Sequence, residues 1–228
     1  MLLSLILFGS RARGDHRMKS DVDLLGITDA WRKSSPSKRG TSIHLYDHEN
    51  LLRKSQNGDL FVCHLVREGV VLHDTAGVFR KIRTAFRFKK SYSSEIKCGS
   101  SIIKFLTQNE FDFDQIDVRK RLVWAIRTVI IARAANNEEV AFSSKALETF
   151  ANMPGLANVI DNRSTVEALK LLAMAQSVDD IYGFKNRNSK FPSDLHDQVR
   201  YLQGIGGVAE STLSLTSVNI TDPILDYH

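Results

Sequence analysis

Two short apolar segments, each beside a distinctive polar motif, constrain the fold of this chain more than any other feature. The first, Leu2–Phe8, runs directly into Gly9-Ser10, and the second, Val22–Ile27, begins directly after Asp21. Apolar runs of this length, bounded by turn-forming residues, are typical of buried β-strands. Because residues i and i+2 point to the same face of a strand, we expect Asp21 and Asp23 to project together.

The residue types around these segments indicate chemistry on phosphate. Gly9 lets the backbone approach a ligand, the Gly9-Ser10 turn can cradle a phosphate with its amides, and Arg11 and Arg13 suit anionic oxygens. Adjacent carboxylates such as Asp21 and Asp23 are costly unless a cation neutralises them, and Mg²⁺ binds such oxygens while bridging to substrate phosphates. A lone Gly-Ser turn is typical of a hairpin, and a lone Asp-Val-Asp of a strand edge. Together and in this order, they predict a two-metal-type site for phosphoryl or nucleotidyl transfer.

The composition narrows the class of protein. The chain has 228 residues, which is long enough for one domain or two small ones. Of these residues 43% are hydrophobic and 25% charged, a balance that argues against disorder. Its net charge of +5 allows an anionic partner. Cys63 and Cys98 are too few for a disulfide framework, which favours a reducing compartment. No apolar run approaches the ~20 residues of a membrane span, so we expect a cytoplasmic protein with no membrane partner.

Local patterns divide the chain near residue 91. We expect strands at Leu2–Phe8, Val22–Ile27, Thr41–Tyr46 and Val70–His73 and a loop at residues 9–15. We also expect helical turns at 49–67, interrupted at Asn57-Gly58, and one helix at 76–90. Helical periodicity then predicts helices at 96–109, 115–136, 143–150, 164–182 and 193–202, followed by a tail at 214–228. The predicted fold class is α+β: a small mixed-sheet domain at residues 1–91, followed by an all-α helical bundle at residues 92–228.

Gly9-Ser10, the Arg-Ala-Arg-Gly that follows, and Ser20-Asp21-Val22-Asp23-Leu24-Leu25 resemble the signature of the DNA polymerase beta-like nucleotidyltransferase superfamily. The similarity is to its minimal nucleotidyltransferase and kanamycin nucleotidyltransferase-like branch, and it covers about residues 1–90. The resemblance implies that Gly9 and Ser10 hold the triphosphate tail, with Arg11 or Arg13 assisting, and that Asp21 and Asp23 bind divalent metal.

The chain departs from the family pattern in two places. It starts almost at the first strand, where the family has a preceding helix, so either a short N-terminus is tolerated or the start is later than in relatives. The third family carboxylate, on the next strand, is replaced by His44. Three interpretations are open: His44 is a neutral ligand or general base, Asp47 or Glu49 supplies the oxygen, or the site binds nucleotide without turning it over.

The resemblance implies a nucleotidyltransferase that uses Mg²⁺ or Mn²⁺ to move a nucleoside monophosphate from a nucleoside triphosphate, ATP included, to a hydroxyl of a protein, nucleic acid or small molecule. Bacterial toxin–antitoxin and phage-defence pairs are the expected setting, and a homo-oligomer is among the expected assemblies. The alternative is a catalytically degenerate module that binds nucleotide, nucleic acid or a partner protein.

A basic run lies outside this motif. Between residues 80 and 90, six of eleven residues are cationic, and Phe86 and Phe88 are interleaved with them. Two interpretations are open: the run tracks a nucleic-acid backbone or holds a triphosphate, or it is a solvated helix face. His64 and His73 are expected to be structural.

Overall fold

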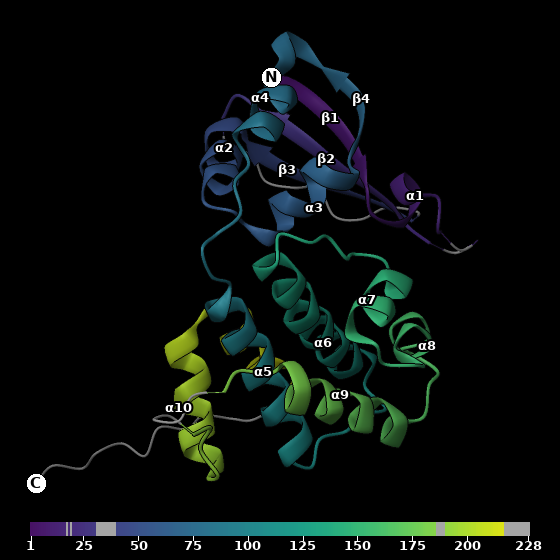
Figure 1. The fold of residues 1–228 in the computed structure, drawn as a ribbon, viewed down its shortest axis with the longest axis vertical. Coiled ribbons are helices and arrows are strands. Elements are labelled where there is room, and N and C mark those ends of the chain that lie inside the picture. The colour runs from purple at the N-terminus through teal and green to yellow at the C-terminus, as the bar shows by residue number, and fades with distance from the viewer. Residues whose placement is uncertain (17, 19, 31–39, 186–189, 217–228) are drawn as a thin grey trace, which may run out of the picture. The chain divides into compact units, whose positions relative to one another are not determined.

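The computed structural model describes residues 1–16, 18, 20–30, 40–185 and 190–216 (Figure 1). It divides into two compact units. One contains Met1–Tyr92 together with Ala134–Ala146, and the other contains Ser93–Arg133 and the chain from Leu147 onward. The segment at 134–146, which the sequence places within the helical part, therefore belongs to the same unit as the sheet.

The first unit is built on a four-stranded mixed sheet in the order β3-β2-β1-β4. Its strands are β1 (Leu2–Phe8), β2 (Val22–Thr28), β3 (Thr41–Asp47) and β4 (Val70–Asp74). β1 pairs antiparallel with both β2 and β4, and β2 pairs parallel with β3. The register places Phe8 opposite Asp23 and Asp23 beside Ser42, so the polar motifs of the first two strands meet at one end of the sheet.

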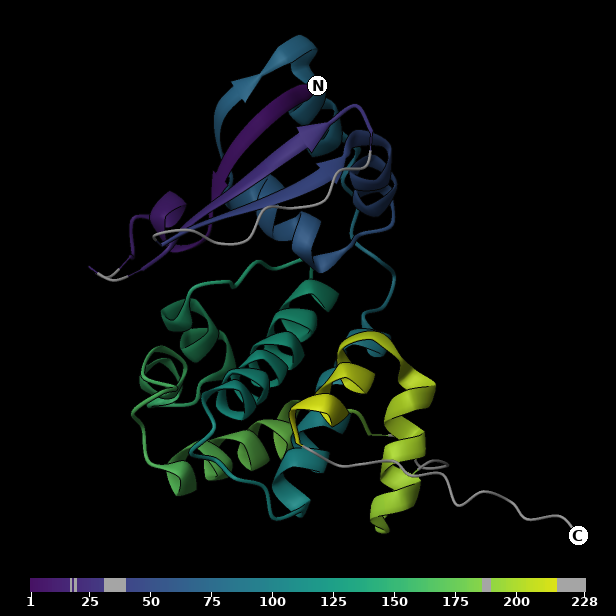
Figure 2. The same cartoon turned by 180° about the vertical axis from the view of Figure 1, so that it is seen from behind.

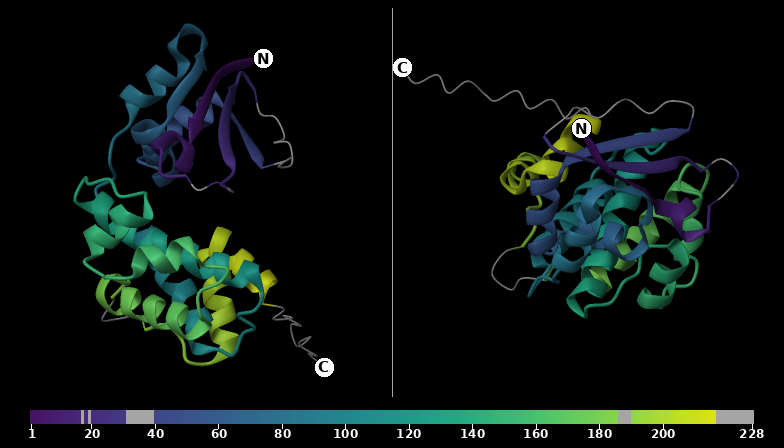
Figure 3. Two further views of the ribbon diagram at one scale, coloured as in Figure 1. Left: turned by 90° about the vertical axis from the view of Figure 1, so that its right-hand side faces the viewer. Right: turned by 90° about the horizontal axis from the view of Figure 1, so that it is seen from above.

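Helices α2 (His48–Gln56), α3 (Leu60–Glu68) and α4 (Val78–Ala85) lie on one face of this sheet (Figures 1 and 2; Figure 3, left). Aspartates cap two of them: the side chain of Asp47 accepts a hydrogen bond from the Asn50 amide, and that of Asp59 accepts from the first turn of α3. The strands and helices share a core of fully or almost fully buried side chains, which are Ile6, Leu25, Ile27, Leu51, Val62, Leu65, Phe79 and Ile82.

Two local predictions in this unit are wrong. Residues 9–15 are not a loop throughout, because Gly9–Arg13 form the short helix α1, which ends at Gly14 in the left-handed conformation. Residues 76–90 are not one helix. A 3₁₀ turn, η1 (Thr75–Gly77), leads into α4, which ends at Ala85, and Phe86 continues in an extended conformation.

The second unit is helical. It is built from α5 (Ser93–Gln108), most of α6 (Ile116–Asn136) and α7 (Ser144–Ala151), α8 (Leu156–Asp161), α9 (Ala168–Tyr182), α10 (Leu195–Ile205) and α11 (Gly207–Leu215). The apolar stripes of α5, α6 and α9 form its core; the fully buried members are Ile102, Phe105, Leu106, Leu122, Ile126, Val129, Ile130, Leu171, Ala175 and Val178. The α+β class, a mixed sheet followed by helices, is thus confirmed.

The C-terminal predictions need correction at two points. Helix α8 was missed, and α11 occupies residues that the sequence assigns partly to a tail; of that tail, residues 217–228 lie outside the described residues. In the described part of the chain, no helix has the length and apolarity needed to cross a membrane.

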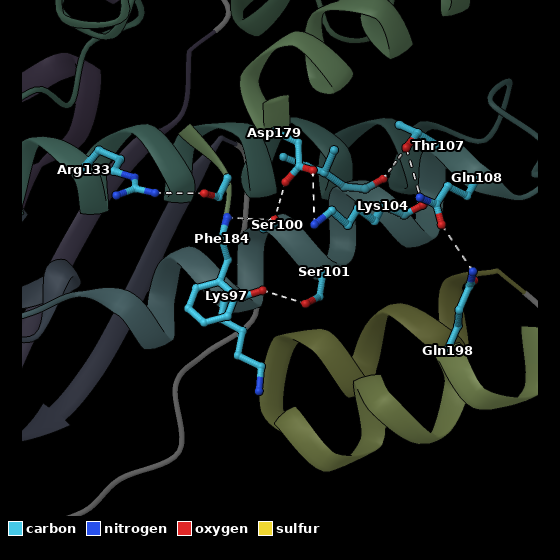
Figure 4. Close-up of polar contacts among 12 residues, drawn as sticks. Lys97, Ser100, Ser101, Lys104, Thr107, Gln108, Arg133, Asp179, Phe184 and Gln198 are labelled. Atoms are coloured by element: carbon cyan, nitrogen blue, oxygen red, sulfur yellow. Dashed lines mark hydrogen bonds and ion pairs between the residues drawn. The ribbon is translucent and has the colours of Figure 1, made fainter. Parts of the chain in front are cut away.

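A buried polar network fastens the end of α9 to α5 (Figure 4). Ser100 donates a hydrogen bond to Asp179 and accepts one from the Phe184 amide, and the Lys104 ammonium lies 3.5 Å from the same carboxylate. Arg133 donates to the last carbonyls of this helix end, those of Tyr182 and Gly183. Burial raises the pKa of Asp179, and the bonds from Ser100 and Lys104 oppose that shift.

Candidate active site

The site begins where β1 runs into α1. Gly9 is buried, has a φ of +73°, and packs so closely on Asp23 that a Cβ at position 9 would lie 2.7 Å from Asp23 Oδ2. Glycine is therefore required twice, for its backbone conformation and for the approach of the carboxylate. Ser10 stands in the first turn of α1, whose leading amide groups receive no side-chain cap. The structure thus brings Gly9, which Ser10 directly follows in the chain, next to Asp23.

The two aspartates differ in their surroundings. Asp23 is half-buried in β2, whereas Asp21 is exposed and directly precedes the strand. Burial, followed by repulsion from Asp21, raises the pKa of Asp23 above its usual value, while His44, His64 and Arg13 act in the opposite direction. The pair is therefore a partly desolvated concentration of negative charge, which a cation would relieve.

The donor set of this pair fits a divalent cation. Mg²⁺ prefers carboxylate oxygens and takes its remaining ligands from water and substrate phosphates, so two adjacent aspartates are sufficient as a protein contribution. Within the described residues, no group of three or more His, Cys, Asp or Glu side chains is arranged to hold a metal. Asp21 and Asp23 are the residues that would hold the ion, which would neutralise phosphate charge when bound.

The two arginines after the Gly-Ser motif brace the site. Arg11 donates from Nε and Nη2 to the Ser20 carbonyl at 3.2 and 2.8 Å, which ties α1 to the residue before Asp21. Arg13 bonds to Asp15 at 3.1 Å and to Glu68 at 2.9 Å. Burial would lower the pKa of Arg13, but these two carboxylates outweigh that effect and raise it. The two guanidinium groups thus connect α1 to Asp15, to Ser20 and to Glu68 of α3.

His64 and Glu68 of α3 belong to the site, although sequence reasoning assigned His64 a structural role and Glu68 no role in it. Glu68 Oε2 lies 2.8 Å from His64 Nε2 and 2.9 Å from Arg13 Nη1, and all three side chains are less than one-fifth exposed. Their charges reach Asp23, because His64 and Arg13 both act on its pKa. The available sequence signal was the His-Glu spacing of four residues, which places both on one helix face.

The Phe8 ring packs beside the two histidines near the aspartate pair. It packs edge-to-face against Phe61 and His64, with centroids 5.8 and 5.9 Å apart, and lies 6.1 Å from the His44 ring. His64 also stacks on Phe142 at 4.6 Å, and Phe142 belongs to the segment that returns to this unit after α6. Aromatic packing therefore sets the position of His64 beside the aspartates.

His44 and Asp47, both on β3, lie at different distances from Asp23 along the sheet. His44 lies on β3 beside Leu25, two positions along from Asp23, and its charge acts on that carboxylate. Asp47 pairs with Thr28, five positions along, which is about 16 Å at the rise of a strand. It also caps α2. This geometry argues against Asp47 as the source of the third oxygen, whereas the assignment of His44 to the third ligand position of the family stays a prediction.

The hydrogen bonds of Glu68 to His64 and Arg13 predict a contribution to folding stability that is lost at acid pH. Burial would raise the pKa of Glu68, but the hydrogen bonds and charges of His64 and Arg13 lower it overall. A carboxyl whose pKa is lowered on folding stabilises the protein above its usual value of 4.5, and that contribution is lost as the pH falls through its folded value. We expect Glu68→Gln to be less stable than the parent at pH 7 and the difference to vanish below the pKa of Glu68. Urea unfolding across pH, with exposed Glu110→Gln as control, measures this; parallel curves for parent and Glu68→Gln contradict it.

The fold and the site define an enzyme class. A mixed sheet that presents a Gly-Ser helix start and a carboxylate pair side by side is the arrangement needed to hold a phosphate chain against a cation. The chain belongs to the nucleotidyltransferase domain family, whose family model, described as "Nucleotidyltransferase domain", matches residues 2–121, just over half of the 228 residues. This match confirms the superfamily resemblance, while the branch stays a prediction. No curated protein matches the chain.

Proposed function

We propose that this protein is an Mg²⁺- or Mn²⁺-dependent enzyme that transfers a nucleoside monophosphate from a nucleoside triphosphate to a hydroxyl group, with release of pyrophosphate. The observation that carries the proposal is the contact between Gly9 and Asp23, which holds the phosphate-binding helix start against the carboxylate pair. The acceptor classes are a protein, a nucleic acid or a small molecule. The minimal-branch resemblance adds a bacterial toxin–antitoxin or phage-defence setting.

The site residues have two kinds of proposed role: some bind the triphosphate or the metal, and others keep those residues in position. In this proposal Gly9 and Ser10 bind the triphosphate tail through backbone amides, and Asp21 and Asp23 hold the metal. Arg11 and Arg13 add positive charge near the phosphates. Arg11 also ties α1 to Ser20, just before Asp21, and Arg13 ties α1 to Glu68 of α3. His44 occupies the third position and is the candidate to accept the proton of the attacking hydroxyl.

A direct assay tests the transfer. The protein is incubated with each of the four labelled nucleoside triphosphates, Mg²⁺ and acceptor mixtures of cell RNA, protein and small hydroxyl compounds, and pyrophosphate release is measured. We expect Asp21→Asn/Asp23→Asn to lose at least about 10³-fold in rate, because the substitution removes the charges that hold the ion but keeps the side-chain shapes. Asp114→Asn, an exposed aspartate of the helical unit, is the matched control. Pyrophosphate release that Asp21→Asn/Asp23→Asn retains contradicts the proposal.

One observation favours the second candidate, a module that binds nucleotide without transfer. No third carboxylate reaches the Asp21/Asp23 pair within the described part of the chain, because Asp47 is engaged at α2. A thermal shift with each triphosphate and Mg²⁺ separates the two candidates. Stabilisation of the parent without pyrophosphate release in any acceptor mixture identifies the binding module, whereas stabilisation with release identifies the enzyme.

A further inference from the structure

A basic surface lies away from the Gly9–Asp23 contact, on α4, the extended segment after it, and the end of α3. Its members are Arg67, Arg80, Lys81, Arg83, Arg87 and Lys90. All six residues are exposed, and residues 75–94 contain no aspartate or glutamate. Within the described residues, none of these six side chains forms an ion pair with a carboxylate, whereas a solvated helix face with mixed charges would offer such pairs. The Asp74 carboxylate, before α4, accepts from the main-chain amide of Arg80 at 3.3 Å rather than from its guanidinium. The surface therefore carries unneutralised positive charge.

Two of these arginines are ordered by neutral groups. Arg83 Nη2 donates to the Gly69 carbonyl at 2.9 Å, and its guanidinium lies 5.0 Å from the centroid of the Phe79 ring. The Arg67 guanidinium lies 5.5 Å from the centroid of the Phe88 ring. A guanidinium has five N–H donors, so the single bond to Gly69 leaves Arg83 with donors for an anion. Because aromatic rings and a carbonyl already order these two guanidinium groups, the side chains lose less entropy when they bind an anion. These neutral partners leave the positive charge of the arginines in place.

Arg67 and Arg83 line a surface pocket of about 220 Å³ whose other lining residues are Val66 and Phe86. The Phe86 and Phe88 rings pack edge-to-face at 5.2 Å and form an aromatic edge next to the arginines. Two planar cations around an apolar floor suit a phosphate group, whose oxygens accept paired N–H bonds, together with the apolar part of its neighbour. The pocket is distinct from the Gly-Ser motif, which lies at the end of β1.

The spread of charge fits a polymer better than one triphosphate. From Arg80 to Lys90 the chain covers most of α4 and then the non-helical segment after it, a contour of about 24 Å. A nucleic acid presents a phosphate about every 3.4 Å of helix axis along each strand, so the surface spans several phosphates. α3 connects this surface to the site, because it carries Arg67 as well as the His64–Glu68 pair that braces Arg13.

We propose that this basic surface binds the phosphate backbone of a nucleic acid, with one phosphate seated in the pocket between Arg67 and Arg83. If the proposed transferase function holds, the bound nucleic acid is the acceptor, and this reading of the surface rests on that function. Binding of nucleic acid does not itself depend on the transferase function, because none of the residues of the basic surface is among those proposed to hold the metal or the triphosphate.

Fluorescence anisotropy of the full chain with labelled single-stranded RNA, single-stranded DNA and duplex DNA tests the proposal, in the absence of triphosphate and divalent metal. We expect dissociation constants on the order of 1–10 µM at about 100 mM salt. Arg67→Gln/Arg83→Gln is expected to bind about tenfold more weakly and to lower the slope of log K against log salt by about 1.4 for single strands. The strand type that binds most tightly identifies which backbone the surface prefers.

Two further variants keep the test decisive. Lys170→Gln/Arg200→Gln removes the same charge from exposed positions of the helical unit and should change affinity less than about twofold. Lys81→Gln/Lys90→Gln alters exposed lysines for which the structure shows no contact within the described residues, so it should weaken binding without affecting folding. Equal weakening by Lys170→Gln/Arg200→Gln, no binding of any nucleic acid, or binding of polyglutamate as tight as that of RNA overturns the proposal. Nucleic-acid binding without nucleotidyl transfer leaves it standing and refutes the transferase alone.

Discussion

Replacing Gly9 with alanine is expected to lower the rate of nucleotidyl transfer at least about 100-fold, because displacing a reacting group by about 1 Å costs that much. The new Cβ would lie 2.7 Å from Asp23 Oδ2, so the carboxylate or the start of α1 must move. The carboxylate is half-buried beside Phe8 and cannot move away without losing its position next to Asp21. The transfer assay and metal titration by thermal shift measure the two consequences.

Gly14 supplies a matched control at the other end of α1. Its φ of +78° is close to the +73° of Gly9, but a Cβ there meets nothing within 4 Å. Gly14→Ala therefore also places a side chain at a positive φ, at a cost of about 1–2 kcal/mol, without the clash. We expect it to lose stability but keep most of its rate. If both variants lose activity equally, the contact with Asp23 is not what the site requires.

The part of the fold that could be predicted follows from local apolar patterns. Strand β1 is visible as a short, nearly continuous apolar run before a turn, and β3 as a segment in which polar and apolar residues alternate from Ser42 to Leu45. Both patterns are local, so they can be recognised without knowing which strands are neighbours in the sheet. Helix α1 could not be predicted, since a helix of five residues that begins directly after a strand, without a capping side chain, has the sequence of a turn. Helix α8 begins after Gly155 in the left-handed conformation and is held by packing of Leu156 and Val159 rather than by its pattern.

The candidate site separates in the same way. Gly9 and Asp23 could be paired in advance because two adjacent antiparallel strands bring their motifs together. His64 and Glu68 lie some fifty residues beyond Arg13 and join it only through the packing of α3 on β1, which periodicity does not encode. The geometry argues against the Asp47 alternative for a related reason. Closeness in sequence to His44 suggested closeness to the site, but a strand carries successive residues away at about 3.3 Å each.

The largest effect on stability is expected at Arg119, a buried arginine of α6 that is 8% exposed. It donates to the Phe113 carbonyl, to the Arg163 carbonyl at 3.2 Å and to the Val166 carbonyl at 2.6 Å. It thereby joins the loop before α6 to the loop between α8 and α9. Arg119→Ala would leave three carbonyls without these bonds, and a buried acceptor without a partner costs about 1–3 kcal/mol. We expect a loss of about 3 kcal/mol in the free energy of unfolding of the helical unit, measured by urea denaturation followed by circular dichroism.

Two variants decide whether the fork geometry of Arg119 or only its charge matters. Arg119→Lys keeps the charge, but an ammonium on a flexible stem does not reproduce the planar donors that reach two loops at once, so it should recover less than half of the loss. Lys120→Ala, at the next position of α6, removes an exposed lysine that pairs with Asp117, three residues earlier, and should cost at most about 0.5 kcal/mol. Full recovery by lysine would show that the carbonyls need only a nearby cation. A loss in Lys120→Ala comparable to that in Arg119→Ala would place the stabilisation in the helix itself rather than in the loops that Arg119 joins.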